Sequence, residues 1–160
     1  MASNDLFSTE RAGFLERLAG LSGRTTWREP AGGAHYTGGV PDAHALAASL
    51  AYARRGEHDI GPDILVCVAC QTEHRRPRIV AELAAALVAE CGRVAKRNQH
   101  ALLAIAARAY MGVVYGKHYT PPSGVRMHDY LLLSRMGEAT LWQAAEQSLR
   151  LAERAYRAAA

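Results

Sequence analysis

The chain is 160 residues long, and 49% of it is hydrophobic and 21% charged, which excludes a wholly disordered protein and allows one domain with a sizeable core. No uninterrupted apolar run reaches the ~18 residues of a transmembrane helix, and the N-terminal residues lack the pattern of a secretory signal, so we expect no membrane partner. The formal net charge is +4. Three cysteines are an odd number and too few for a disulfide scaffold, which indicates a reducing compartment and predicts a cytoplasmic protein.

The apolar residues are mostly Ala and Leu, with few aromatic residues and few β-branched runs. This mixture favours helices over strands, because Ala and Leu have high helix propensity and β-branched residues favour sheets. We therefore predict an all-α fold, a single compact helical domain over residues 1–160 with about six to seven helices.

The N-terminal third predicts two helices separated by a long loop. The first helix is expected over residues 9–21, with glycine after its end. Residues 24–41 are rich in Gly and Pro and have no hydrophobic period, so they are expected to form the loop. Loops of this length are usually functional or mobile. The second helix is expected over residues 42–55, with Asp42 as its cap.

Two further helices are expected in the middle of the chain. Pro62 suits the first turn of a helix over residues 62–71, although the run DILVCVAC is also compatible with a buried strand. Pro77 then opens a long helix that ends at about Arg97. Its apolar stripe has spacings of four and three residues and consists of Ile79, Leu83, Leu87, Cys91 and Val94.

Residues 99–116 contain a single charged side chain, Arg108, and leave little polar surface on a helix. A helix that is apolar almost all round is normally the buried centre of a domain. Gly116 and the two prolines at 121 and 122 end it. We expect the fold to be built around this helix.

Residues 123–160 predict a short helix, a tight turn at Gly137 and a long closing helix. That order is compatible with a helix-turn-helix, which presents one helix to a DNA groove. Thr140 and Gln143 lie near the start of the second helix, where base-reading side chains sit, and Arg135 can bind a phosphate. The alternative is a plain α-hairpin that packs the apolar stripe of the last helix into the core.

The charge is unevenly distributed along the sequence. Residues 1–74 carry −3, residues 75–117 carry +6 and residues 118–160 carry +1. A positive segment of this kind attracts phosphate or an acidic partner. A solvated basic face is the alternative, because 17 of the 19 basic residues are Arg, as expected from a GC-rich coding sequence. Three cations are expected to neutralise phosphates: Arg93, Lys96 and Arg97.

Catalytic and metal-binding motifs are not evident. Cys67, Cys70 and His74 share one face of a helix, but zinc needs four ligands and a second pair is missing, so small core residues are the preferred interpretation. Residues 32–39 are rich in Gly without the spacing of a phosphate loop. No H-E-x-x-H, G-x-S-x-G or paired-carboxylate pattern occurs. We predict neither an enzyme nor a cofactor nor a metal.

Residues 95–157 carry Asn98 ahead of a Leu-rich helix, Tyr110 and Gly112 within that helix, and two Ala-Glu pairs in the last helix. In this order the C-terminal half resembles phage Q-type antitermination proteins, which are similar to the sigma-factor region that reads promoter DNA through a helix-turn-helix. The chain differs by a longer Pro-containing connector, residues 117–124. The resemblance implies DNA binding near a promoter and contact with RNA polymerase.

These observations predict a small DNA-associated transcription regulator of the phage antiterminator type, with double-stranded DNA and RNA polymerase as partners. The alternative is a non-enzymatic helical adaptor or inhibitor that binds another protein through the 24–41 loop or a helix face. In the first case the DNA-binding residues are Arg93, Lys96, Arg97, Arg135, Thr140, Gln143 and Arg150.

Overall fold

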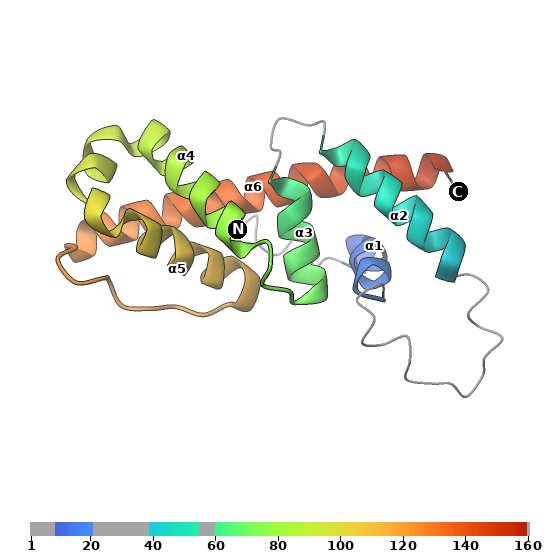
Figure 1. Ribbon diagram of the computed structural model, residues 1–160, viewed down its shortest axis with the longest axis horizontal. Coiled ribbons are helices and arrows are strands. Elements are labelled where there is room, and N and C mark those ends of the chain that lie inside the picture. The colour runs from blue at the N-terminus through green and yellow to red at the C-terminus, as the bar shows by residue number, and fades with distance from the viewer. Residues whose placement is uncertain (1–8, 21–38, 55–59, 160) are drawn as a thin grey trace. The chain divides into compact units, whose positions relative to one another are not determined.

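A computed structural model describes residues 9–20, 39–54 and 60–159 (Figure 1). Within these ranges every regular element is a helix and there is no strand, so the predicted all-α class is confirmed. The predicted 24–41 loop lies outside the described residues, apart from its last three residues, which begin a helix. The helices are α1 (Thr9–Gly20), α2 (Gly39–Ala53), α3 (Gly61–Cys70), α4 (Arg76–Arg97), the short 3₁₀ helix η3 (Gln99–Ala101), α5 (Leu102–Tyr115) and α6 (Met127–Ala159).

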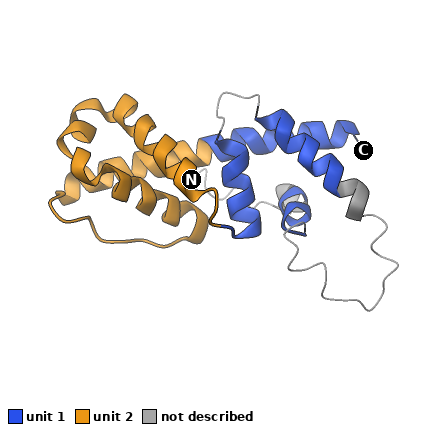
Figure 2. Cartoon of the chain, viewed as in Figure 1, with its two compact units in different colours: residues 1–72, 144–160 blue, residues 73–143 orange. Residues whose placement is uncertain are grey.

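The chain divides into two compact units (Figure 2). Unit 1 consists of residues 1–72 and 144–160, and unit 2 consists of residues 73–143. The helix α6 contributes its first half to unit 2 and its second half to unit 1. The prediction of one domain over the whole chain stays a prediction.

In unit 1, α1, α2 and α3 pack against one another. Phe14 of α1 also makes an edge-to-face contact with Tyr156 of α6, with the ring centroids 5.8 Å apart. Gly61 lies at a close approach between α3 and α6, since a Cβ there would come within 2.5 Å of the Ala144 carbonyl oxygen. The apolar side chains that are almost completely buried in this unit include Leu46, Ile64, Leu65, Cys67 and Leu149.

The segment that could have been a strand is a helix. Pro62 occupies the first turn of α3, where its missing N–H is not needed for the helix. The helix ends at Gln71, whose left-handed backbone (φ 53°, ψ 44°) lets its N–H donate to the carbonyl of Cys67 at 3.0 Å. The strand interpretation of DILVCVAC is therefore wrong.

In unit 2, α4 and α5 lie side by side, joined by η3 (Figure 1). The stripe predicted for α4 buries Ile79, Leu83 and Leu87, but the helix is interrupted at Gly92 (φ 19°, ψ −86°), and beyond this point Val94 is only half-buried. The helix α5 buries most of its length, as expected of a central helix, and its C-terminus is closed by a left-handed glycine. The fully buried side chains of α5 are Ile105, Ala106, Ala109 and Tyr110.

The predicted turn at Gly137 is wrong, and with it the helix-turn-helix and the alternative α-hairpin. The helix α6 runs without a break from Met127 to Ala159. A Cβ on Gly137 would lie 3.0 Å from the Cβ of Ala109 and 3.5 Å from a methyl carbon of Leu83. The glycine is therefore explained by the close packing of α6 on α5 and α4, and not by a change of chain direction.

Candidate nucleic-acid interface

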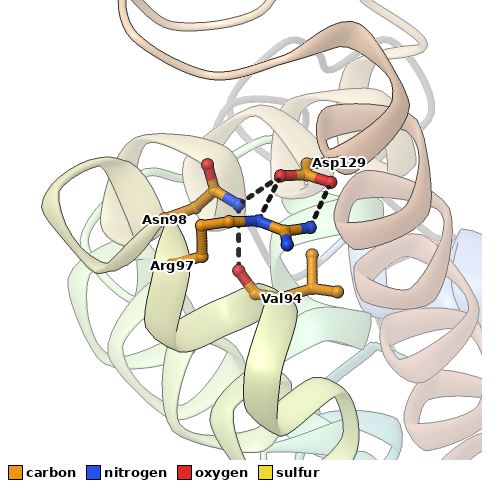
Figure 3. A network of polar contacts seen from close by, with 4 residues as sticks. All are labelled: Val94, Arg97, Asn98 and Asp129. Carbon is orange, nitrogen blue, oxygen red and sulfur yellow. Dashed lines mark hydrogen bonds and ion pairs between the residues drawn. The ribbon is translucent and has the colours of Figure 1, made fainter.

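A buried carboxylate ties the end of α4 to the start of α6 (Figure 3). The guanidinium of Arg97 donates to both carboxylate oxygens of Asp129, from Nε at 3.0 Å and from Nη2 at 2.8 Å. The side-chain amide of Asn98 donates to the same carboxylate at 3.0 Å and to the carbonyl of Val94 at 2.9 Å. This bidentate geometry is the strong form of an Arg–carboxylate pair.

Local sequence explains how these groups reach their positions. Asn98 follows the last residue of α4, and its backbone N–H donates to the carbonyl oxygens of Val94 and Ala95, which ends the helix. Asp129 is in the first turn of α6, where the helix dipole favours an acidic side chain. The carboxylate therefore meets an arginine, an amide and a helix N-terminus at once.

The pKa values of the two charged partners move in opposite directions. Hydrogen bonds from Arg97, and secondarily from Asn98, hold the pKa of Asp129 below its ordinary value. The hydrogen bond to Asp129 raises the pKa of Arg97. Both side chains are therefore ionised at neutral pH, and much of the positive charge of Arg97 is matched by its partner even though half of its side chain is exposed.

Three exposed cations remain around this network. Arg93 and Lys96 lie on the last turns of α4, and Arg126 directly precedes α6. None of the three has an ion-pair partner within the part of the chain that the structure describes. The Arg97–Asp129 pair joins the end of α4 to the start of α6, and these two helix ends lie at the same end of unit 2 (Figure 1). The three cations on these helix ends therefore belong to that end of the unit. We call Arg93, Lys96, Arg97 and Arg126 the basic end.

Unit 2 as a whole is also positively charged. Unit 2 contains ten Lys and Arg residues and five Asp and Glu residues, which gives it a formal charge of +5. The rest of the chain contains nine basic and ten acidic residues and so carries −1. Two exposed histidines also belong to this end of the unit: His100 lies beside Gly124, and His128 directly precedes Asp129.

The other residues predicted to bind DNA do not join the basic end. Arg135 and Gln143 are exposed along α6, and the hydroxyl of Thr140 donates to the carbonyl of Met136 one turn earlier in the same helix, at 2.8 Å. Because α6 is continuous, none of them lies at the start of a recognition helix. Arg150 belongs to unit 1 and pairs with Glu146 at 2.6 Å.

Arg126 and the polar pair formed by Asn98 and Asp129 were not predicted from the sequence. Arg126 is isolated in the sequence from the arginines near position 95, so no charge run marked it. Asn98 and Asp129 are 31 residues apart, and no spacing rule connects residues at that separation.

The cysteine motif is divided between the two units. Cys67 is buried in unit 1 and the thiol of Cys70 donates to the carbonyl of Leu18 at 3.4 Å, whereas His74 is exposed in unit 2. Among the described residues no three His, Cys, Asp or Glu side chains are grouped so that they could hold a metal ion. No helix in these ranges is long and apolar enough to cross a membrane.

Comparisons of the chain with protein-family models, with curated proteins and with solved structures gave no match. The resemblance to phage Q-type antitermination proteins therefore stays a prediction.

Proposed function

We propose that this protein is a small DNA-associated transcription regulator that holds double-stranded DNA through the basic end of unit 2. The observation that carries the proposal is that three exposed cations, Arg93, Lys96 and Arg126, lie at the helix ends that the Arg97–Asp129 pair joins, and none has an ion-pair partner in the described part of the chain. Phosphates are the ligands that such a cluster fits, because each neutralised phosphate releases a condensed counterion. The proposal includes no catalytic step and no cofactor.

Contacts of this kind position a protein on the duplex without reading its sequence. The proposed complex therefore has little preference for one DNA sequence over another, since no helix-turn-helix is present in α6 to supply base contacts. A more specific version of the proposal is that the protein acts at a promoter as a phage-type antiterminator. It would then also contact RNA polymerase.

The test is the salt dependence of binding to a fluorescently labelled duplex of about two helical turns, measured by anisotropy. Three phosphate contacts predict a slope of log K against log salt of about −2.7, which is about a 40-fold loss of affinity between 50 mM and 200 mM salt. The double variant Arg93→Ala/Lys96→Ala is expected to bind every duplex more weakly and to reduce the slope by about 1.8.

The matched control is Arg154→Ala/Arg157→Ala, which removes two exposed arginines from unit 1. It changes the net charge by the same amount and is expected to keep the wild-type slope. The proposal fails if the protein does not bind the duplex at 50 mM salt, or if the two double variants lose affinity equally.

A role as a protein-binding adaptor is the second candidate, and one specific observation favours it. The half of α6 in unit 2 exposes Leu131, Leu132 and Met136, which phosphates cannot use. The 24–41 loop, the other predicted binding element of an adaptor, lies outside the described residues apart from its last three positions.

A further inference from the structure

The Arg97–Asp129 pair uses only part of the hydrogen-bonding capacity of its guanidinium. A guanidinium has five N–H donors in a planar fork. Asp129 accepts from two of them, on Nε at 3.0 Å and on Nη2 at 2.8 Å. The other three have no hydrogen-bond partner among the described residues. The side chain of Arg97 is 52% exposed and that of Asp129 only 4%, so these three donors remain accessible to a ligand.

The carboxylate that holds Arg97 is itself fixed in place (Figure 3). The buried side chain of Asn98 donates to Asp129 at 3.0 Å and to the Val94 carbonyl at 2.9 Å, which occupies both N–H groups of its amide. The backbone of Asp129 belongs to the first turn of α6. The direction of the Arg97 guanidinium is therefore set by two neighbouring helix ends and not by its own rotamer preferences.

Stability alone is a weak explanation for this arrangement. Taking an ion pair out of water costs free energy, and replacing such a pair by apolar residues is often neutral or stabilising. A lysine would match the charge of Asp129 but lacks the fork that binds a carboxylate with one edge and leaves the other edge free. Arg97 follows Lys96 directly and is four residues after Arg93, at a spacing that places two Cβ atoms about 5–6 Å apart on one helix face. The free edge therefore belongs to the exposed cations of the basic end.

We propose that Asp129 is a positioning residue for nucleic-acid binding, which holds Arg97 so that its free edge hydrogen-bonds a phosphate of the duplex. The proposal rests on the proposed function and adds a fourth phosphate contact to those of Arg93, Lys96 and Arg126. Two N–H groups of one guanidinium suit two oxygens of a phosphate. Because the side chain is already ordered, this contact avoids most of the rotamer entropy that an exposed arginine loses on binding.

The fourth contact differs from the other three in its dependence on salt. Arg97 and Asp129 together carry no net charge, so their contact with a phosphate releases few counterions. The exposed cations at the basic end have no such partner, and each of them contributes to the salt slope. Arg97 therefore adds directed hydrogen bonds to the affinity, while the slope stays near the value of about −2.7 for three contacts.

The experiment is duplex anisotropy with the full-length double variant Arg97→Gln/Asp129→Asn. This variant removes one positive and one negative charge, so the net charge is unchanged, and the two new amides can hydrogen-bond to each other. Its affinity is expected to be about fivefold or more weaker at both 50 mM and 200 mM salt, with an unchanged slope. The matched control, Arg54→Gln/Asp63→Asn, replaces an arginine and a buried carboxylate that pair at 2.9 Å in unit 1, and is expected to bind like the wild type.

Asp129→Asn alone separates positioning from charge. If Arg97 bound only by its charge, loss of the carboxylate would tighten binding, by less than about twofold across a guanidinium in water. Loss of the fixed orientation is instead expected to weaken binding about two- to tenfold at 200 mM salt. Thermal melting verifies that the variant is folded. Asp129→Glu keeps the charge and the ion pair but moves the carboxylate by one methylene, and it is also expected to bind more weakly than the wild type, which gives a test if Asp129→Asn does not fold.

Failure of this inference is distinguishable from failure of the proposed function. Absence of duplex binding by the wild type at 50 mM salt would refute both. If the wild type binds and Arg97→Gln/Asp129→Asn binds equally well, only the inference is refuted. A slope that is shallower by about 0.9 or more in the double variant would mean that the pair acts only by holding Arg126 in place. Tighter binding by Asp129→Asn at 200 mM salt would mean that the carboxylate only neutralises Arg97, and either result would overturn the inference.

Discussion

Replacing Gly137 by alanine tests whether α6 is one helix packed closely against α5. The new methyl carbon would lie 3.0 Å from the Cβ of Ala109 and 3.5 Å from a methyl carbon of Leu83. Carbon atoms are optimally separated by about 3.5–4.0 Å, so the contact with Ala109 is too short by about 0.5–1 Å. The Leu83 side chain can rotate, but the Cβ of Ala109 is fixed to the backbone, so relief requires a shift of α5.

Two effects of opposite sign decide the change in the free energy of unfolding. Inserting a methyl group into a packed interior costs about 1–3 kcal/mol. Alanine is favoured over glycine in a helix interior by about 1 kcal/mol. The packing term is the larger, so we expect Gly137→Ala to be less stable than the wild type by about 1 kcal/mol, which lowers the melting temperature by about 2–8 °C.

Urea unfolding followed by circular dichroism measures this difference. The matched control is Ala139→Gly, on an exposed position of the same helix, which changes helix propensity without altering any close contact and is expected to cost about 1 kcal/mol. If Gly137→Ala instead gains about 1 kcal/mol, the close approach to α5 is refuted. If Ala139→Gly costs nothing, the helix is not formed at that point.

Three further predictions concern individual side chains. The partners of Asp129 lower its pKa in the folded protein, so the ionised carboxylate stabilises the fold above about pH 4. This stabilisation is lost as the pH falls through the pKa of the folded state. The urea midpoint of Asp129→Asn should therefore be lower than that of the wild type at pH 7, and the two midpoints should converge towards about pH 2. Burial raises the pKa of Glu138, so ionisation opposes folding there, and Glu138→Gln should gain stability relative to the wild type as the pH rises from about 4 to 7. Equal pH profiles for either variant and the wild type would contradict these assignments. Gly61→Ala would place a methyl group 2.5 Å from the Ala144 carbonyl oxygen and in overlap with the Ser148 hydroxyl. Thermal melting should therefore show a destabilisation of about 1–3 kcal/mol or more. An unchanged melting temperature would mean that α3 and α6 are further apart than the structure has them.

The helices were largely predictable because their signals are local. The stripe of α4 and the proline in the first turn of α3 act within one or two helical turns, and the structure has helices at both places. The error at Gly137 has a different origin. A glycine between two apolar segments is compatible with a turn and also with close helix packing, and the deciding neighbours, Leu83 and Ala109, lie far away in the sequence.

In the candidate site, too, the local features were predictable from the sequence and the contacts between distant residues were not. The arginine-rich end of α4 was visible as a charge cluster, and Arg93 and Lys96 are exposed there. The partner of Arg97 was not visible, because Asp129 reaches it only through the packing of α6 beside α4. The contact with Asp129 neutralises much of the charge of Arg97, which was expected to bind a phosphate. The same packing of α6 beside α4 adds Arg126 to the basic end.

Salt dependence separates DNA binding at the basic end from the adaptor role that the exposed apolar side chains of α6 favour. Binding of DNA depends on counterion release, so its affinity should fall steeply across the whole salt range. A protein partner held by Leu131, Leu132 and Met136 makes apolar contacts that salt does not screen, so its affinity should change little at high salt. A steep and continuous decline for the duplex therefore supports the basic end, whereas an affinity that levels off at high salt would mean that apolar contacts hold the ligand.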